Sequence, residues 1–271
     1  MIHNRSSMRR ALRTATASAV IVGLSFALAP VAASAADAGT GWLRLGHLSP
    51  DTKSVDVEVT TPDGATVLEL NGVSYGEVSP YSELQVGTYT VSMVPAESSA
   101  ATAPVISAEI EVPATSATTV VAYGPSTDLE VKAVDDDLAA PTAGLGRVRL
   151  FQASTITDSV DVETSTGLPI AKDAAAGTVT DYAEIPAGSW TLELTGGKGD
   201  ATSDVDVAAG SVSTLFVLDT ADGGLTILPI VDSAAVGDSP LGGVQTGGGG
   251  TAPRDFFSTI GGRGEGTGAF E

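Results

Sequence analysis

His47 is the residue in this chain best suited to acid/base chemistry. The only other histidine, His3, lies in a leader segment described below, so any Ser-His-Asp or histidine-based mechanism has to use His47. The sequence places His47 at the end of a strand, beside the turn Ser49-Pro50-Asp51, in which proline fixes φ and the Ser and Asp side chains bond nearby amides. An imidazole there can hydrogen-bond the turn backbone, so a structural histidine is predicted rather than a catalytic or metal-binding one.

Carboxylates are the other groups that could do chemistry, either as calcium ligands or as the acid pair of a glycosidase. Three of them are adjacent, Asp135-Asp136-Asp137. Calcium takes six to eight oxygen ligands, and three consecutive side chains in a linker do not point at one centre. The stretch DTADGG at residues 219–224 lacks the EF-hand spacing and is interpreted as a turn. No pair of acids has a spacing that predicts glycosidase geometry. We therefore predict no catalytic residue, no metal site and no cofactor.

An internal repeat indicates how these residues are positioned. The stretch GWLRLGHLSPDTKSVDVEV at residues 41–59 recurs as GRVRLFQASTITDSVDVET at residues 146–164, with ten of nineteen positions identical at an offset of 105. This similarity indicates a duplicated domain. In the second copy Gln152 replaces His47. Glutamine can keep a hydrogen bond but cannot transfer a proton near neutral pH, which again favours a structural role for His47.

Short segments with period-2 alternation, bounded by Gly, Pro, Asp or Ser, predict strands throughout both copies. In the first copy they are residues 42–48, 55–60, 66–70, 81–84, 88–94, 105–112, 117–123 and 129–134. No segment after the leader shows a convincing apolar stripe with helical period. The predicted fold class is all-β, with two tandem immunoglobulin-like antiparallel β-sandwich domains. The first repeat is predicted at residues 41–135, a linker at 136–145 and the second repeat at 146–233.

The motif SVDVE occurs in both copies and suggests a structural ion pair. Asp56 and Asp161 alternate with valines that would face the core, so the two carboxylates point to the other face of the sheet. We predict cross-strand pairing of Asp56 with Arg44 and of Asp161 with Arg149.

The two ends of the chain differ from the repeats. Four arginines precede an apolar run of about 15 residues that closes on Ala33-Ser34-Ala35, which is the order of a secretory signal peptide. Residues 1–35 are therefore predicted to be cleaved near Ala35. Residues 236–271 are rich in glycine and are predicted to be disordered. They contain no apolar run approaching the roughly 20 residues of a transmembrane helix.

The charge of the chain restricts its partners. Removing the leader leaves nine of the 13 Lys and Arg residues against all 33 Asp and Glu residues, a formal charge of −24. Nucleic acid and anionic lipid are poor partners for such a charge. The absence of cysteine excludes disulfides, thiolate metal sites and cysteine nucleophiles.

The pattern Arg44-x-x-His47-x-Ser49-Pro50-Asp51, followed by Val55-Asp56-Val57, resembles the opening of a bacterial exported family, domain of unknown function 4397 (DUF4397). The resemblance covers most of residues 41–231, as two copies. It implies tandem immunoglobulin-like β-sandwiches at the cell surface and no known activity. The second copy keeps Arg149, Ser154 and Val160-Asp161-Val162 but lacks the His, Pro and Asp of the first, so a role that needs those three is not expected there.

These features predict an exported, non-enzymatic tandem β-sandwich protein of the cell envelope or extracellular space, acting as a binding, adhesion or spacer module. We expect a monomer that is secreted or held non-covalently at the cell surface, and whose partner is an envelope polymer or protein. Two alternatives stay open. One is a calcium-stiffened adhesin, and the other is a carboxylate-based extracellular carbohydrate-active or hydrolytic domain.

Overall fold

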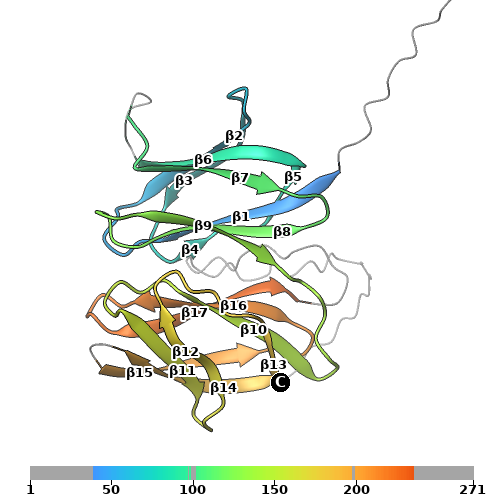
Figure 1. Ribbon diagram of the computed structural model, residues 1–271, viewed down its shortest axis with the longest axis vertical. Coiled ribbons are helices and arrows are strands. Elements are labelled where there is room, and N and C mark those ends of the chain that lie inside the picture. The colour runs from blue at the N-terminus through green and yellow to red at the C-terminus, as the bar shows by residue number, and fades with distance from the viewer. Residues whose placement is uncertain (1–38, 97, 99–101, 197–198, 235–271) are drawn as a thin grey trace, which may run out of the picture. The chain divides into compact units, whose positions relative to one another are not determined.

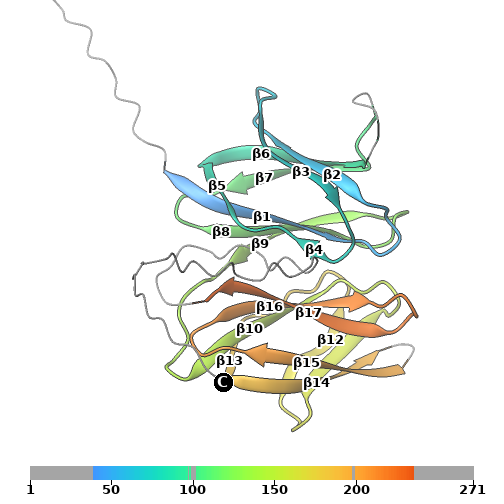
Figure 2. The same ribbon diagram turned by 180° about the vertical axis from the view of Figure 1, so that it is seen from behind.

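The computed structural model describes residues 39–96, 98, 102–196 and 199–234. All regular structure in these residues is β-strand, arranged in four sheets, two for each copy of the repeat. Figures 1 and 2 show the two layers of each copy. The predicted fold class, two tandem β-sandwiches, is confirmed. The predicted signal peptide and the predicted disordered tail lie outside the described residues.

The first repeat comprises strands β1 to β9. One of its sheets contacts the second repeat, and we call it the first junction sheet; the other is the first outer sheet. The first junction sheet has the order β4(Glu77–Val78)-β1(Thr40–Leu48)-β8(Ala117–Tyr123)-β9(Glu130–Asp136), with β5(Ser82–Gln85) also pairing with β1. The first outer sheet has the order β3(Thr66–Val73)-β2(Val55–Thr60)-β6(Gly87–Pro95)-β7(Ile106–Val112).

The second repeat comprises strands β10 to β17 and follows the same plan. The second junction sheet has the order β13(Ala183–Pro186)-β10(Leu145–Gln152)-β16(Val212–Asp219)-β17(Leu225–Ser233). The second outer sheet has the order β12(Pro169–Ala175)-β11(Ser159–Thr164)-β14(Gly188–Gly196)-β15(Gly199–Val207).

The alternation in the outer strands produces one hydrophobic core in each repeat. In β2, for example, Val55, Val57 and Val59 are buried, whereas Asp56 and Glu58 point away from the core. The first core is formed between the first outer and first junction sheets, and the second core between the corresponding sheets of the second repeat.

The junction sheets differ from the outer sheets because both of their faces are covered. Every residue of β8 and of β16 is buried. A third hydrophobic cluster joins the two junction sheets; it contains Leu48, Val78, Val121 and Tyr123 of the first repeat and Phe151, Ala153, Phe216, Leu218 and Ile230 of the second. The two repeats are therefore packed against each other through an apolar interface.

Several details differ from the sequence prediction. The central pairs β1–β8 and β10–β16 are parallel, although antiparallel pairing was predicted. Parallel strands buried on both faces have nearly continuous apolar sequences rather than alternating ones, as ATTVVAY of β8 does. The short strand β4 was not predicted. Asp136 and Leu145 belong to β9 and β10, whereas the linker was predicted to include both. None of the described residues forms a helix long and apolar enough to cross a membrane.

Candidate functional site

The candidate site is a network of buried charged and hydroxyl side chains between the two junction sheets. The positions of these side chains follow from the alternating direction of side chains along a β-strand. Leu43 and Leu45 of β1 point into the first core, so Arg44 between them points out of it, toward the second repeat. In the register of β1 with β8, Arg44 lies opposite Thr119. The second repeat has the same arrangement, with Arg149 of β10 opposite Thr214 of β16.

Arg44 connects the two repeats. Its Nε donates to Thr119 Oγ1 at 2.7 Å, and its guanidinium lies 4.6 Å from the ring centroid of Tyr81. Its Nη2 pairs with Oδ1 of Asp232, which comes from β17 of the second repeat. Within the first repeat, Thr119 and Tyr81 donate to Oδ2 of Asp136 at 2.6 and 2.5 Å.

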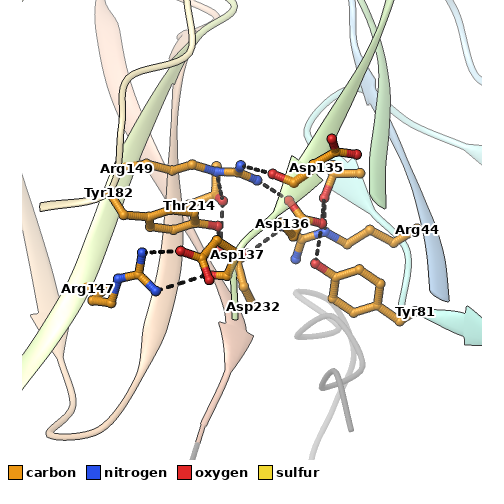
Figure 3. Close-up of polar contacts among 11 residues, drawn as sticks. Arg44, Tyr81, Asp135, Asp136, Asp137, Arg147, Arg149, Tyr182, Thr214 and Asp232 are labelled. Atoms are coloured by element: carbon orange, nitrogen blue, oxygen red, sulfur yellow. Dashed lines mark hydrogen bonds and ion pairs between the residues drawn. The ribbon is translucent and has the colours of Figure 1, made fainter. Parts of the chain in front are cut away.

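Arg149 of the second repeat makes the equivalent contacts with the first repeat. Its Nε donates to Thr214 Oγ1 at 2.9 Å, its guanidinium lies 4.7 Å from the ring centroid of Tyr182, and its Nη2 pairs with Oδ1 of Asp136 in the first repeat. Thr214 and Tyr182 donate to Oδ2 of Asp232 at 2.8 and 2.9 Å. Each aspartate is thus bound by a threonine and a tyrosine of its own repeat and by the arginine of the other. Figure 3 shows this reciprocal arrangement.

The four charged side chains are almost fully buried: Arg44 and Asp232 have no exposed side-chain surface, and Arg149 and Asp136 have 4% and none. For Arg44, burial lowers the pKa, but the negative charges around it, Asp232 first, more than offset this and hold the pKa above its usual value. Two guanidinium groups and two carboxylates face one another, so the buried network is neutral as a whole.

Burial acts in the opposite sense on the pKa of Asp232 and of the two tyrosines of the network. It raises the pKa of Asp232, while the nearby guanidinium of Arg44 counteracts the shift. Burial also raises the pKa of Tyr81 and of Tyr182. Both phenols therefore stay protonated and act as hydrogen-bond donors to the aspartates.

The junction has further contacts at its edges. The hydroxyl of Tyr75 accepts a hydrogen bond from the backbone NH of Asp219 at 2.7 Å and donates to its carbonyl at 3.2 Å. Lys132 Nζ donates to the carbonyl oxygen of Gly177 at 2.6 Å. Gly177 has a φ of 75°, and a Cβ at this position would overlap the ring of Tyr123. A glycine is thus needed there both for the backbone conformation and for the close approach of the first repeat.

The predicted pairing of Arg44 with Asp56, and of Arg149 with Asp161, is wrong. β1 and β2 belong to different sheets, so Arg44 and Asp56 are not cross-strand neighbours. Asp56 instead accepts a hydrogen bond from the backbone NH of Gly72 at 2.7 Å. Asp161 accepts one from the NH of Asp173, on the neighbouring edge strand β12. The alternation of apolar and polar residues predicted correctly that the aspartates and the arginines point away from the cores. It did not predict which residues they contact there.

His47 is buried, and no carboxylate or hydroxyl side chain among the described residues hydrogen-bonds its imidazole. Its Nε2 lies 3.3 Å from the carbonyl oxygen of Thr52, and burial lowers its pKa. Ser49 Oγ bonds Thr52 Oγ1 at 2.7 Å rather than the imidazole. Asp51 accepts hydrogen bonds from the backbone NH and the hydroxyl of Ser126 at 2.7 and 2.8 Å, which lower its pKa. These residues tie the end of β1 to the neighbouring turns.

The stretch Gly72-Val73-Ser74-Tyr75-Gly76 matches the Gly-x-Ser-x-Gly pattern of serine hydrolases. It lies between strands β3 and β4, whereas the nucleophile of those enzymes sits on a strand-to-helix turn. Ser74 Oγ contacts Ser54 Oγ at 3.2 Å and the carbonyl oxygen of Gly72 at 3.5 Å. It has no base among these partners, so the match is a sequence coincidence in a strand connection.

The three adjacent aspartates have separate partners. Asp136 binds Arg149, Asp137 Oδ2 accepts from Arg147 Nη2 at 2.7 Å, and the backbone carbonyl of Asp135 accepts from Arg149 Nη1 at 2.9 Å. Across the described part of the chain, no group of three or more His, Cys, Asp or Glu side chains is arranged to hold a metal ion.

Six members of the network were not predicted from the sequence: Tyr81, Thr119, Asp136, Tyr182, Thr214 and Asp232. A usable signal was present, because Tyr81 and Tyr182 occupy the same place in the aligned copies, as do Thr119 and Thr214. Recurrence alone was not decisive, because Asp56 and Asp161 also recur in both copies and lie outside the network.

A family model described as a domain of unknown function (DUF4397) matches residues 41–163 and again residues 148–240. The chain belongs to the DUF4397 family. The two matches correspond to the two repeats, and they overlap at the start of the second. No curated protein sequence matches this DUF4397 protein.

Three solved structures show a distant resemblance to the DUF4397 protein. The Bacillus anthracis TIE protein aligns at 12% identity with a TM-score of 0.24, over 66% of this chain and 34% of that one, so the chain spans about a third of its length. A streptococcal virulence factor, described for its alpha-glucan binding, aligns at 13% identity and a TM-score of 0.22 over 69% and 96% of the two chains. A candidate cell adhesion protein from Bacteroides uniformis aligns at 12% identity and a TM-score of 0.19 over 70% and 98%. Similarity at this level establishes no shared function.

Proposed function

We propose that the chain is an exported, non-enzymatic module of the cell envelope or extracellular space, in which two β-sandwiches docked as one body bind an envelope polymer or protein or hold other groups apart. The observation that carries this proposal is that the buried arginine, aspartate and histidine side chains make structural contacts. Arg44, Arg149, Asp136 and Asp232 join the repeats, and His47 ties down a strand end. These groups serve the architecture rather than a reaction.

The docking of the repeats also supports a role that depends on rigidity. A connection of residues 137–144 alone would allow the two repeats to move independently. The apolar cluster and the two buried ion pairs restrain that motion. A module whose two halves keep one orientation holds its outer sheets and end loops at a set separation, which suits either a spacer or a surface that binds a repeating polymer.

Export is tested by expressing the full chain, and a chain that lacks residues 1–35, in a bacterial host. We expect the full chain in the envelope or medium, with its N-terminus near Ala36 when sequenced, and the shortened chain in the cytoplasm. A full chain that stays in the cytoplasm with its first 35 residues intact would contradict the proposal.

Binding is tested by co-sedimentation of the chain from residue 36 onward with washed, insoluble cell-wall polymer. The heat-unfolded chain is the control for non-specific adsorption. Saturable retention of the folded chain alone supports a polymer-binding module. Equal recovery of the folded and unfolded chains in the supernatant would overturn polymer binding and leave the spacer role.

A further inference from the structure

The contacts across the junction have the pattern of a two-fold symmetric interface. In such an interface residue i of one partner contacts residue j of the other, and j contacts i. Here the arginine of the first repeat binds the aspartate of the second, and the arginine of the second binds the aspartate of the first. The duplicated chain thus reproduces, within one molecule, the interface of a symmetric dimer.

Each junction face therefore carries both halves of the polar interaction. The first face presents Arg44 and Asp136, and the second presents Arg149 and Asp232 at the corresponding strands. Nothing in this polar set distinguishes a partner repeat in the same chain from one in another copy of the chain.

The apolar part of the junction does distinguish the two faces. Gly46 and Val121 of the first face correspond to the bulkier Phe151 and Phe216 of the second. The ring of Tyr123 packs edge-on against that of Phe151, with centroids 5.5 Å apart. At two other positions the size difference is reversed, since Leu48 and Tyr123 of the first face correspond to the smaller Ala153 and Leu218 of the second. Bulky residues thus occupy different positions on the two faces, so a first repeat fits a second repeat better than another first repeat.

The covalent connection at residues 137–144 is what causes each repeat to dock on the other repeat of the same chain rather than on a repeat of a second chain. Each repeat has a hydrophobic core of its own. A short connection gives the intramolecular partner an effective concentration in the millimolar range, so the closed monomer is favoured in dilute solution. A second chain can take that place when closure within one chain is prevented.

We propose that the junction face is a docking surface for a second copy of this chain, and that two copies can exchange repeats, the first repeat of each docking on the second repeat of the other. This inference is independent of any ligand of the outer surfaces. Exchange of repeats would allow the same junction that closes one chain to join two chains.

Two full-length charge variants test the proposal, both made from residue 36 onward. The acidic variant carries Arg44→Asp and Arg149→Asp, and the basic variant carries Asp136→Arg and Asp232→Arg. Neither can close its own junction, because four like charges would be buried together. Mixed together, they can restore all the opposite-charge pairs, but only if the repeats are exchanged between the two chains.

The readout is molar mass by light scattering during size-exclusion chromatography. We expect each variant alone to elute as a monomer and the equimolar mixture to double in mass. As a matched control, the acidic variant is mixed with a chain carrying Asp56→Arg and Asp161→Arg, which adds the same charge outside the junction. No dimer is expected there. A mixture that stays monomeric, or a control that dimerises equally, would overturn the proposal.

Circular dichroism shows whether the charge variants fold. If they do not, a further variant without charge changes tests the same proposal. Deleting residues 138–143 keeps every residue of the polar network and of the apolar cluster. It shortens the connection to Asp137 and Gly144 and is designed to keep the two repeats of one chain from docking on each other. We expect this chain to form a dimer of twice the monomer mass. A folded monomer would contradict repeat exchange.

Discussion

Two sets of buried polar residues include side chains of strand β1 in the first repeat, and only one of the sets is complete in the second. The arginine, threonine, tyrosine and aspartate of the network occur in both repeats. The group around His47 does not, since Gln152 takes its place and accepts a hydrogen bond from the backbone NH of Ser154 at 2.9 Å. The network that joins the repeats is therefore present in both of them, whereas the buried histidine is present only in the first.

The largest effect is expected from removing one charge of the network. Asp232→Asn keeps the size of the side chain but leaves Arg44 buried without a counter-ion. We expect the free energy of unfolding to fall by about 3–5 kcal/mol, measured by chemical denaturation. Asp56→Asn is the control, because Asp56 lies outside the network, and a loss of less than about 1 kcal/mol is expected. Equal losses would contradict the distinction drawn here.

Replacing both partners sharpens that prediction. The double variant Arg44→Met with Asp232→Leu removes the charge pair without leaving an unpaired ion, and such replacements are often close to neutral. We expect most of the stability lost in Asp232→Asn to return, as measured in the same denaturation experiment. A double variant less stable than the single one would show that the hydrogen bonds to Thr214 and Tyr182 outweigh the ion pair.

The symmetry of the network predicts matched effects of smaller size. Tyr81→Phe and Tyr182→Phe each remove one phenol that donates to a buried aspartate. Each change is expected to cost about 1–3 kcal/mol, and the two losses should agree closely. Thermal unfolding of both variants in parallel checks this. A clear loss in only one of them would contradict the equivalence of the two halves.

His47→Gln is expected to have a smaller effect, of about 1 kcal/mol, because the second repeat already folds with glutamine there. The substitution should also change how the free energy of unfolding depends on pH. Burial lowers the pKa of His47, so on acidification the unfolded chain takes up this proton before the folded chain does. The wild type therefore loses stability as pH falls below the usual histidine pKa, and the variant lacks this loss. Denaturation at pH 7.5 and pH 5 measures the difference; parallel changes in both proteins would show that His47 does not titrate differently on folding.

Calcium is expected to have no effect. Asp136 and Asp137 are already bound by Arg149 and Arg147, and calcium would need six to eight oxygens. Thermal midpoints with calcium and with a chelator should coincide for the wild type. A midpoint raised by calcium and returned to the original value by Asp136→Asn would revive the calcium-stiffened adhesin.

The sequence was sufficient to predict the strands and the duplication, because alternation and turn residues are local signals. It also drew attention to Arg44 and Arg149. It could not assign their partners, since a period of two gives the face of a strand but not the sheet that packs on that face. Strand β8, ATTVVAY, contains no charged residue, a pattern typical of a strand buried on both faces. Asp136 was assigned to a linker because Pro141 and two glycines follow it, whereas the cation that allows its burial, Arg149, lies in the second repeat.

A double-mutant cycle tests the central claim most directly, namely that Arg44 binds across the junction rather than within its own repeat. The free energy of unfolding is measured for Arg44→Ala, Asp232→Ala and the pair, and in parallel for Arg44→Ala with Asp56→Ala. We predict a coupling on the order of 1–3 kcal/mol for Arg44 with Asp232 and none beyond about 0.5 kcal/mol for Arg44 with Asp56. Coupling to Asp56 in the absence of coupling to Asp232 would contradict the reciprocal junction and with it the docking of the two repeats.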